Sequence, residues 1–229
     1  MAGLRPKIVT FDVYMALLDI QGSLVTVFAD ALGLSPADAG PMVRLWRAKQ
    51  MELAAISNSL GQGRRSFREC TRLGLDYVLA SNGLTLADKA RKDLVIAWDR
   101  MNPWPEAKDV VAEVKHRGYA TAILSNGDQD MLDAVAGNFG TDMDYVLSSE
   151  TAGFYKPHPA VYQLPARVLD IAVADTLHVA GSPNDVLGAG AFGMTCYWSN
   201  RAADRVLDPA FGPTYEGRDL TGVLALLEG

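Results

Sequence analysis

The sequence is short of cysteine, of basic charge and of long apolar runs, and each shortage excludes a class of protein. Its two cysteines, Cys70 and Cys196, have no metal-ligand spacing, so we expect free thiols in a reducing compartment. A formal net charge of −6 argues against binding to nucleic acid or to an anionic membrane surface. No apolar run reaches transmembrane length, and no signal peptide is visible. We therefore expect a cytoplasmic protein with neither nucleic-acid nor membrane partners.

Apolar residues, in contrast, make up 49% of the 229 positions, enough for a sizeable buried core. Residues 21–101 have the spacing of helices and little strand character. Ser35 followed by Pro36 is typical of a helix start, and apolar residues recur at intervals of three and four over residues 41–56. Further helical patterns cover residues 67–79 and 86–98. This stretch is predicted to be an all-helical subdomain.

The clearest boundary is residues 102–105 (NPWP), where two prolines break any helix. After this point helical and strand patterns alternate. Predicted helices cover residues 105–117, 128–138, 159–169 and 185–192, and predicted strands cover residues 120–124, 145–147, 176–180 and 195–198. Together with a first strand at residues 8–11, the alternation predicts an α/β fold with a parallel sheet. The expected domains are a core of residues 1–20 and 102–229 and a helical subdomain of residues 21–101.

Asp12 lies directly after the first predicted strand, residues 8–11 (IVTF). A short run of β-branched and aromatic residues indicates a buried parallel strand. Open parallel sheets bind ligands beyond the carboxyl ends of their strands. A carboxylate there can coordinate a metal, accept a proton or attack carbon as a nucleophile. The alternative is that Asp12 only caps a following helix, and spacing alone does not separate the two.

Polar side chains also follow three later predicted strands. They are Ser125 and Asn126, then Lys156, then Ser182, Asn184 and Asp185. Each has a structural alternative, namely a turn, a surface lysine, or a helix cap followed by Pro183. Because the carboxyl ends of parallel strands can converge on one cleft, the four groups together favour a shared site. Two carboxylates, an amine and hydroxyls would support nucleophilic attack and stabilise the charge that it moves.

These four segments resemble the sequence motifs of the haloacid dehalogenase superfamily. They are residues 11–14 (FDVY), 124–127 (LSNG), 155–157 (YKP) and 181–185 (GSPND), and nearly the whole chain fits. The resemblance implies a Rossmann-like core, with the helical subdomain at the position of the superfamily's cap after the first strand.

Within the superfamily the chain is similar to the L-2-haloacid dehalogenases. Tyr14 stands where the phosphatases carry a second aspartate, and Gly181 stands where they carry an acidic magnesium ligand. Without both carboxylates too few hard oxygen ligands remain for a well-held magnesium ion. The resemblance therefore implies an enzyme with neither a metal nor another cofactor.

The implied chemistry is a two-step displacement on a small 2-substituted carboxylic acid. The Asp12 carboxylate attacks the α-carbon and expels the leaving group, and water then hydrolyses the aspartyl ester. Because the attack inverts the α-carbon, an L-substrate gives a D-2-hydroxy acid. The resemblance assigns Lys156 to balance the charge of Asp12. It assigns Asp185, supported by Ser182, to orient or deprotonate the hydrolytic water.

The resemblance also implies a set of substrate contacts. Ser125 and the backbone amides near Tyr14 would hold the substrate carboxylate. Residues 45–50 (LWRAKQ) resemble the cap helix whose arginine faces the leaving halide, so Arg47 is expected there together with Asn126. Tyr162 matches a family tyrosine near the site, although it could instead pack a helix against the sheet. Family members are commonly dimers, so a homodimer is expected.

Two departures from the family bear on the substrate. Met15 and Ala16 replace the usual Gly-Thr pair. Met15 removes the backbone freedom of glycine, and Ala16 removes a hydroxyl whose hydrogen bond contributes typically ~1 kcal/mol. The fourth motif lacks the usual serine-rich form, which leaves Ser182 and Asn184 to assist Asp185.

These departures keep two alternatives to dehalogenation open. The first is a hydrolase of the same mechanism that opens a C–N bond, resembling azetidine-2-carboxylate hydrolases. The second is a degenerate member that binds a small acid or a partner protein without turnover. A magnesium-dependent phosphatase is the least favoured interpretation.

Overall fold

The computed structural model describes residues 3–227 and divides into two compact units. The core unit contains the chain up to Leu18 and from Pro103 onward, and the helical unit is Asp19–Asn102. The helical unit therefore begins two residues earlier and ends one residue later than the predicted 21–101. The hydrogen bonds explain both shifts. The Asp19 carboxylate accepts from the Gly22 amide and caps the first helix, and the Asn102 amide donates to Ser23 Oγ.

The core unit is built on a six-stranded parallel sheet of order β3-β2-β1-β4-β5-β6. The strands are β1 (Ile8–Phe11), β2 (Ala120–Ser125), β3 (Tyr145–Ser148), β4 (Thr176–Ala180), β5 (Thr195–Ser199) and β6 (Tyr215–Gly217). The predicted parallel α/β fold is confirmed, and β6 is a strand that the sequence pattern did not indicate. Since β1 pairs with both β2 and β4, the strand order reverses beside β1, where open α/β sheets bind ligands.

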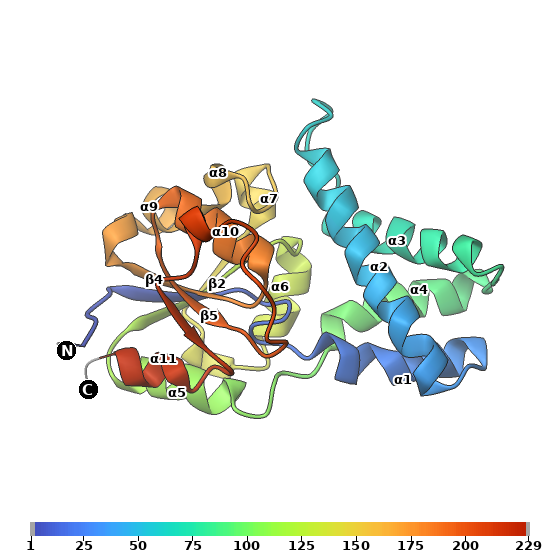
Figure 1. The fold of residues 1–229 in the computed structure, drawn as a ribbon, viewed down its shortest axis with the longest axis horizontal. Coiled ribbons are helices and arrows are strands. Elements are labelled where there is room, and N and C mark those ends of the chain that lie inside the picture. Colours follow the sequence, from blue (N-terminus) through green and yellow to red (C-terminus); the bar gives the residue numbers. More distant parts are fainter. Residues whose placement is uncertain (1–2, 228–229) are drawn as a thin grey trace. The chain divides into compact units, whose positions relative to one another are not determined.

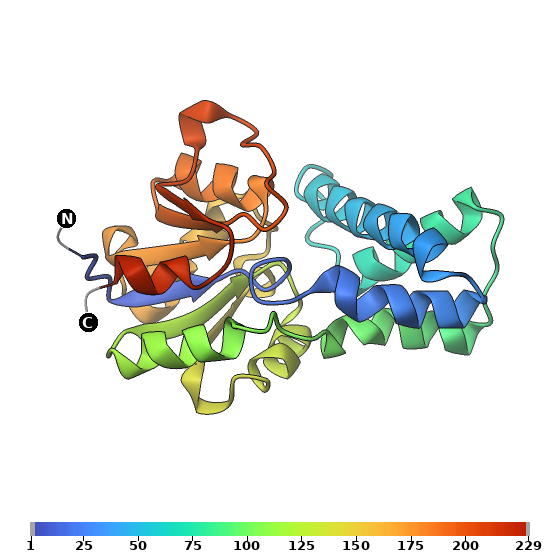
Figure 2. The same ribbon diagram turned by 60° about the horizontal axis from the view of Figure 1, so that its bottom comes forward.

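Helices cover both faces of this sheet. They are α5 (Ala107–His116), α6 (Gln129–Ala136), α7 (Ser149–Ala152), α8 (Pro159–Tyr162), α9 (Leu164–Leu169), α10 (Pro183–Phe192) and α11 (Gly222–Leu226). Single 3-10 turns lie at Gly140–Asp142, Val173–Asp175 and Pro209–Phe211. Helices α5 and α11 lie on one face, and α8, α9 and α10 lie on the other (Figures 1 and 2). All residues of β1 and β4 are buried, as expected for strands covered on both sides.

One helix of the core was predicted as continuous but is divided into two in the structure. Residues 159–169 are not continuous but break at Gln163 into α8 and α9. Pro165 lies in the first turn of α9 and has no amide hydrogen to donate to the preceding turn, so the helix cannot run through it.

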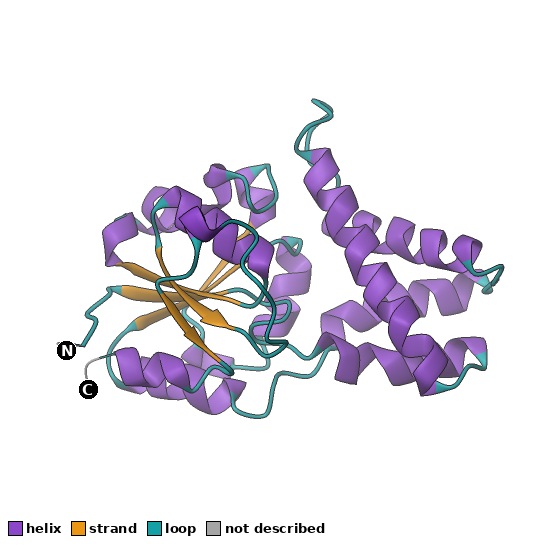
Figure 3. Cartoon of the chain, viewed as in Figure 1, coloured by secondary structure: helices purple, strands orange, loops and turns teal. Residues whose placement is uncertain are grey.

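The helical unit contains helices and connecting loops (Figure 3). They are α1 (Ile20–Leu32), α2 (Pro36–Ser57), α3 (Phe67–Ser81), α4 (Asp88–Ile96) and a 3-10 turn at Ala97–Arg100. The predicted start of α2 is confirmed, since Ser35 Oγ accepts from the Asp38 amide at 3.2 Å. Trp46 is fully buried in this unit, with its ring centroid 5.3 Å from that of Trp98, and its Nε1 donates to the Thr71 carbonyl at 2.7 Å. In residues 3–227, no helix is both long and apolar enough to cross a membrane.

Candidate active site

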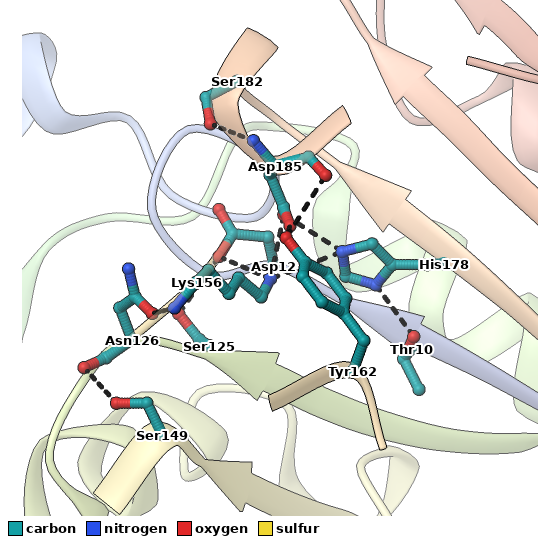
Figure 4. Close-up of polar contacts among 10 residues, drawn as sticks. All are labelled: Thr10, Asp12, Ser125, Asn126, Ser149, Lys156, Tyr162, His178, Ser182 and Asp185. Carbon is teal, nitrogen blue, oxygen red and sulfur yellow. Dashed lines mark hydrogen bonds and ion pairs between the residues drawn. The ribbon is translucent and has the colours of Figure 1, made fainter. Parts of the chain in front are cut away.

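The carboxyl ends of β1 and β2 bring Asp12 together with two of its predicted partners (Figure 4). Asp12 follows the last residue of β1 and is only 7% exposed. Ser125, the last residue of β2, donates its hydroxyl to Asp12 Oδ1 at 3.1 Å. Lys156 Nζ lies 3.4 Å from the same oxygen. Asp12 is not the residue that caps the first helix, because Asp19 has that position.

A second buried carboxylate, Asp185, lies in the first turn of α10 beside the same lysine. Lys156 Nζ donates to Asp185 Oδ2 at 2.8 Å, and His178 Nε2 lies 3.0 Å from that oxygen. The Tyr162 hydroxyl donates to Asp185 Oδ1 at 2.9 Å. Three side chains from three different segments therefore hold one carboxylate (Figure 4).

The charge state of Asp185 follows from this environment. Burial by itself would raise the pKa of Asp185, but the Lys156 ammonium and the His178 imidazole, both hydrogen-bonded to it, hold that pKa well below its ordinary value. Burial raises the pKa of Tyr162 well above its ordinary value, and the negative Asp185 raises it further. Tyr162 therefore stays protonated and donates, while Asp185 stays an anion.

The loop before α8 positions Lys156, which is 5% exposed. Its backbone amide donates to Asn126 Oδ1 at 2.8 Å, and the Asn126 carbonyl accepts from Ser149 Oγ at 2.9 Å. The Lys156–Pro157 peptide bond is cis. Asn126 was predicted to face a leaving group; in the structure its side-chain oxygen binds the segment that carries Lys156.

His178 belongs to this cluster, although it was not among the site residues predicted from the sequence. It lies in the middle of β4 with no exposed surface, and its Nδ1 is 2.9 Å from Thr10 Oγ1. Thr10 and His178 are direct partners in the pairing of β1 with β4. A polar residue inside each of two predicted buried strands was the available signal, but the register that joins them is not visible in the sequence.

Tyr162 contacts the same imidazole from α8. Its ring lies edge-on to the His178 ring, with centroids 6.0 Å apart. Gly188 in α10 makes room for the tyrosine, because a Cβ there would come within 2.2 Å of the Tyr162 hydroxyl oxygen. Tyr162 therefore both packs against the sheet and binds Asp185, which combines the two alternatives considered for it.

Ser182 and Asn184, predicted to assist Asp185, differ in their placement. Ser182 is the N-cap of α10, and the Asp185 amide donates to its Oγ at 3.4 Å. Pro183 follows in the first turn, as the helix-cap alternative expected. Asn184 is exposed and is not part of the hydrogen-bond network around Asp185.

Tyr14 and Arg47 belong to different units. Tyr14 is buried in the core unit, where a Cβ on Gly127 would come within 2.9 Å of its hydroxyl oxygen. Arg47 is in α2 of the helical unit and donates to Gln50 Oε1 at 2.6 Å. Its guanidinium carbon also lies 5.8 Å from the centroid of the Trp98 ring.

The turn after β1 packs against the loop after β4. Met15 has a φ of 80°, so the turn keeps a left-handed conformation although glycine is absent. A Cβ on Gly181 would come within 2.2 Å of the Ala16 nitrogen. An acidic side chain at position 181 would therefore require this backbone to move. Across residues 3–227, no three His, Cys, Asp or Glu side chains gather as a possible metal-binding group.

Comparison with known proteins identifies the family. Residues 6–193 match the haloacid dehalogenase-like hydrolases. The (S)-2-haloacid dehalogenase of Pseudomonas sp. (strain YL) is 32% identical over 224 residues, which cover 97% of this chain and 94% of that protein. The (S)-2-haloacid dehalogenase of Xanthobacter autotrophicus is 35% identical over 192 residues, or 82% and 73% of the two chains. The structure of the L-2-haloacid dehalogenase from Xanthobacter autotrophicus with chloropropionic acid covalently bound has a TM-score of 0.82 at 26% identity, covering 96% and 98% of the two chains. This chain is therefore a haloacid dehalogenase-like hydrolase of the L-2-haloacid dehalogenase branch.

Proposed function

We propose that this protein hydrolyses small L-2-haloalkanoic acids to D-2-hydroxy acids through an aspartyl ester on Asp12. The observation that carries the proposal is the Asp12 carboxylate itself, buried at the tip of β1 with Ser125 and Lys156 in contact with one oxygen. The relatives reported above are dehalogenases of 2-haloacids, which favours a carbon–halogen bond over a C–N bond.

In the first step an oxygen of the Asp12 carboxylate attacks the α-carbon from the side opposite the halogen. The new C–O bond forms as the carbon–halogen bond breaks, and the halide leaves with the bonding pair. The α-carbon inverts, and Asp12 becomes a neutral ester. Lys156 stabilises the carboxylate before attack, and its position is fixed by the Asn126 hydrogen bond to its backbone amide.

In the second step water attacks the side-chain carbonyl carbon of the ester. The bond between that carbon and the product oxygen breaks, so the product hydroxyl keeps an oxygen from Asp12 and the water oxygen stays in the regenerated carboxylate. Of the two protons of the water, one goes to the product oxygen to form the hydroxyl, and the other is released to solvent, one for each halide. Asp185 is assigned to orient this water, because its lowered pKa makes it a good acceptor of hydrogen bonds but a weak base.

The remaining contacts are assigned on the family resemblance. Ser125 and the backbone amides near Tyr14 would hold the substrate carboxylate. Arg47 and Asn126 would face the halide. Ser182, whose Oγ accepts from the Asp185 amide, would support Asp185, whereas the exposed Asn184 has no such contact within residues 3–227 to support its assigned role. Of these residues, Ser125 donates to Asp12 Oδ1, so its hydroxyl lies beside the proposed nucleophile.

The test is halide release from both enantiomers of 2-chloropropionate, with mass spectrometry of the Asp12 peptide. We expect release from the L-enantiomer, a D-hydroxy product, and the mass of a 1-carboxyethyl group on Asp12 in a quenched reaction. In water labelled with oxygen-18, a single turnover should place the label in Asp12 and not in the product. Folded protein without halide release, or label entering the product directly, would contradict the proposal. Ring opening of azetidine-2-carboxylate would move the assignment to a C–N bond.

We also propose that the protein works in the cytoplasm as a homodimer. The buried free thiols Cys70 and Cys196 support a reducing compartment, and the family resemblance supports the dimer. Light scattering coupled to size-exclusion chromatography should give twice the chain mass, and the mass of one chain would contradict the dimer.

A further inference from the structure

We infer that His178 is a positioning residue for ester hydrolysis, holding the Asp185 carboxylate through a hydrogen-bond relay that begins at Thr10. The inference rests on the proposed function and adds a residue to its second step. The relay runs from Thr10 Oγ1 to His178 Nδ1 at 2.9 Å, and from His178 Nε2 to Asp185 Oδ2 at 3.0 Å (Figure 4).

The two neighbours of His178 Nε2 favour one direction for the relay. Asp185 Oδ2 is an acceptor at 3.0 Å, and Lys156 Nζ is a donor at 3.3 Å. If Nε2 carried the lone pair, that pair would face a negative oxygen at the shorter distance. With the proton on Nε2, the imidazole donates to Asp185, and Nδ1 accepts from the Thr10 hydroxyl. Both bonds are then satisfied.

The change in charge of Asp12 during the reaction explains why Asp185 Oδ2 needs a second hydrogen-bond donor besides Lys156. Lys156 Nζ contacts Asp12 at 3.4 Å as well as Asp185, and Asp12 loses its charge when it becomes an ester. The lysine therefore has a different set of charges around it in each step. His178 is fixed instead by a fully buried strand, its cross-strand partner Thr10 and the edge-on ring of Tyr162. It can hold Asp185 Oδ2 whatever the charge of Asp12.

This arrangement leaves one hydrogen-bond position on Asp185 for the water. A carboxylate offers about four lone-pair positions for hydrogen bonds. Lys156 and His178 occupy two on Oδ2, and Tyr162 occupies one on Oδ1. The remaining position on Oδ1 has its direction set when Oδ2 is held. His178 also lies 3.3 Å from Lys156 Nζ, but removing it leaves Asp12 its contacts with Ser125 and Lys156. His178 should therefore affect the attack of water more than the attack of Asp12.

The experiment compares four variants with wild type in single-turnover and steady-state assays with L-2-chloropropionate. His178→Phe removes both imidazole hydrogen bonds at similar volume. His178→Gln keeps an N–H donor near the Nε2 position, and Thr10→Val removes only the hydroxyl that starts the relay. Thr176→Val, two residues earlier on β4, is the matched control, because its buried hydroxyl donates to the Ala172 carbonyl and not into the relay.

For His178→Phe we expect kcat to fall between about 10-fold and 100-fold, the scale of a misplaced reacting group. The first burst of halide should keep its wild-type rate, and the ester on Asp12 should accumulate. Thr10→Val should show a smaller change of the same kind, His178→Gln should recover most of kcat, and Thr176→Val should match wild type.

Three results would overturn the inference alone while wild type turns over. They are wild-type kcat in both His178→Phe and Thr10→Val, equal slowing of both steps, and no recovery in a folded His178→Gln. If His178→Phe does not fold, Thr10→Val and His178→Gln decide. Wild-type protein that forms no ester would instead overturn the proposed function, and this inference with it.

Discussion

Lys156 Nζ lies 2.8 Å from Asp185 Oδ2, closer than its 3.4 Å to the proposed nucleophile. One ammonium thus contacts two carboxylates, and all three side chains are less than a tenth exposed. Removing the lysine would leave two buried carboxylates without the ammonium that they share, whereas removing Asp185 would still leave Lys156 paired with Asp12. The lysine therefore has the larger effect on both stability and turnover.

Lys156→Met should lower the free energy of unfolding by about 3–5 kcal/mol, because it leaves buried charge without its partner. Halide release should disappear. Urea unfolding monitored by circular dichroism measures the change in stability. Lys115→Met is the control, because its ion pair with Asp144 is partly exposed and should contribute no more than about 1 kcal/mol. Equal losses in the two variants would show that Lys156 is not a buried charge partner.

Asp185→Asn should separate the two chemical steps. The substitution keeps the shape of the side chain but removes the anion that Lys156, His178 and Tyr162 hold. Ester formation should continue, ester hydrolysis should slow, and the added mass on the Asp12 peptide should persist. Asp12→Asn should instead show neither added mass on the peptide that contains position 12 nor halide release, while the protein stays folded. Full turnover by Asp185→Asn with no added mass would remove Asp185 from the mechanism.

The same carboxylate predicts how stability depends on pH. The folded-state pKa of Asp185 lies below the ordinary value of 3.8 that applies in the unfolded chain, so the unfolded state takes up the proton first as the pH falls. The contribution of Asp185 is complete above that ordinary value and is lost progressively below it. The difference in unfolding free energy between wild type and Asp185→Asn should be constant from about pH 7 to pH 5 and should shrink below about pH 4. A difference that stays constant down to pH 3 would contradict the lowered pKa.

Much of the core was predictable because its signals are local. Residues 8–11 and 176–180 are short apolar runs, and the structure places β1 and β4 at those residues. Ser35 with Pro36 predicted the start of α2 for the same reason, since capping chemistry acts within one turn. The approach of Asp12, Ser125 and Lys156 followed from a general rule about the ends of parallel strands.

What could not be predicted depends on register and loop geometry. Thr10 and His178 meet because β1 pairs with β4 in one register, which neither strand encodes by itself. The bond from the Lys156 amide to Asn126 depends on the path of the loop between α7 and α8. The strand β6 has three residues, two of them partly exposed and one exposed, so it carries no apolar pattern.

Chelation should leave turnover unchanged. The Lys156 ammonium already lies within hydrogen-bond reach of both carboxylates, where a second cation would be repelled, and Gly181 has no room for a further acidic ligand. Halide release after dialysis against EDTA should equal that of untreated enzyme, and added magnesium should not change it. Loss of activity that returns with a divalent cation would contradict this expectation.

The turn at Met15 gives a prediction about stability. Its φ of 80° costs a residue with a side chain roughly 1–2 kcal/mol, which glycine does not pay. Glycine also makes the unfolded chain more flexible, which cancels roughly 0.5–1 kcal/mol of the stability gained by removing the strain. Met15→Gly should therefore leave the free energy of unfolding unchanged or raise it by up to about 1.5 kcal/mol. Met15→Val should lower it by about 1–3 kcal/mol, because a β-branched residue fits this conformation worst.

A methionine in ordinary helical backbone provides the contrast that isolates the role of φ. Met51 lies inside α2, so Met51→Gly should lower the free energy of unfolding by about 1 kcal/mol. Replacing methionine by glycine should therefore not lower the free energy of unfolding at position 15 but should lower it at position 51. Urea unfolding of both variants measures the two changes. The Trp104 indole donates to the Met15 carbonyl at 3.2 Å, a bond that Met15→Gly leaves intact. If Met15→Gly loses as much stability as Met51→Gly, the turn is not strained, and the usual glycine of the family is not needed for its backbone conformation.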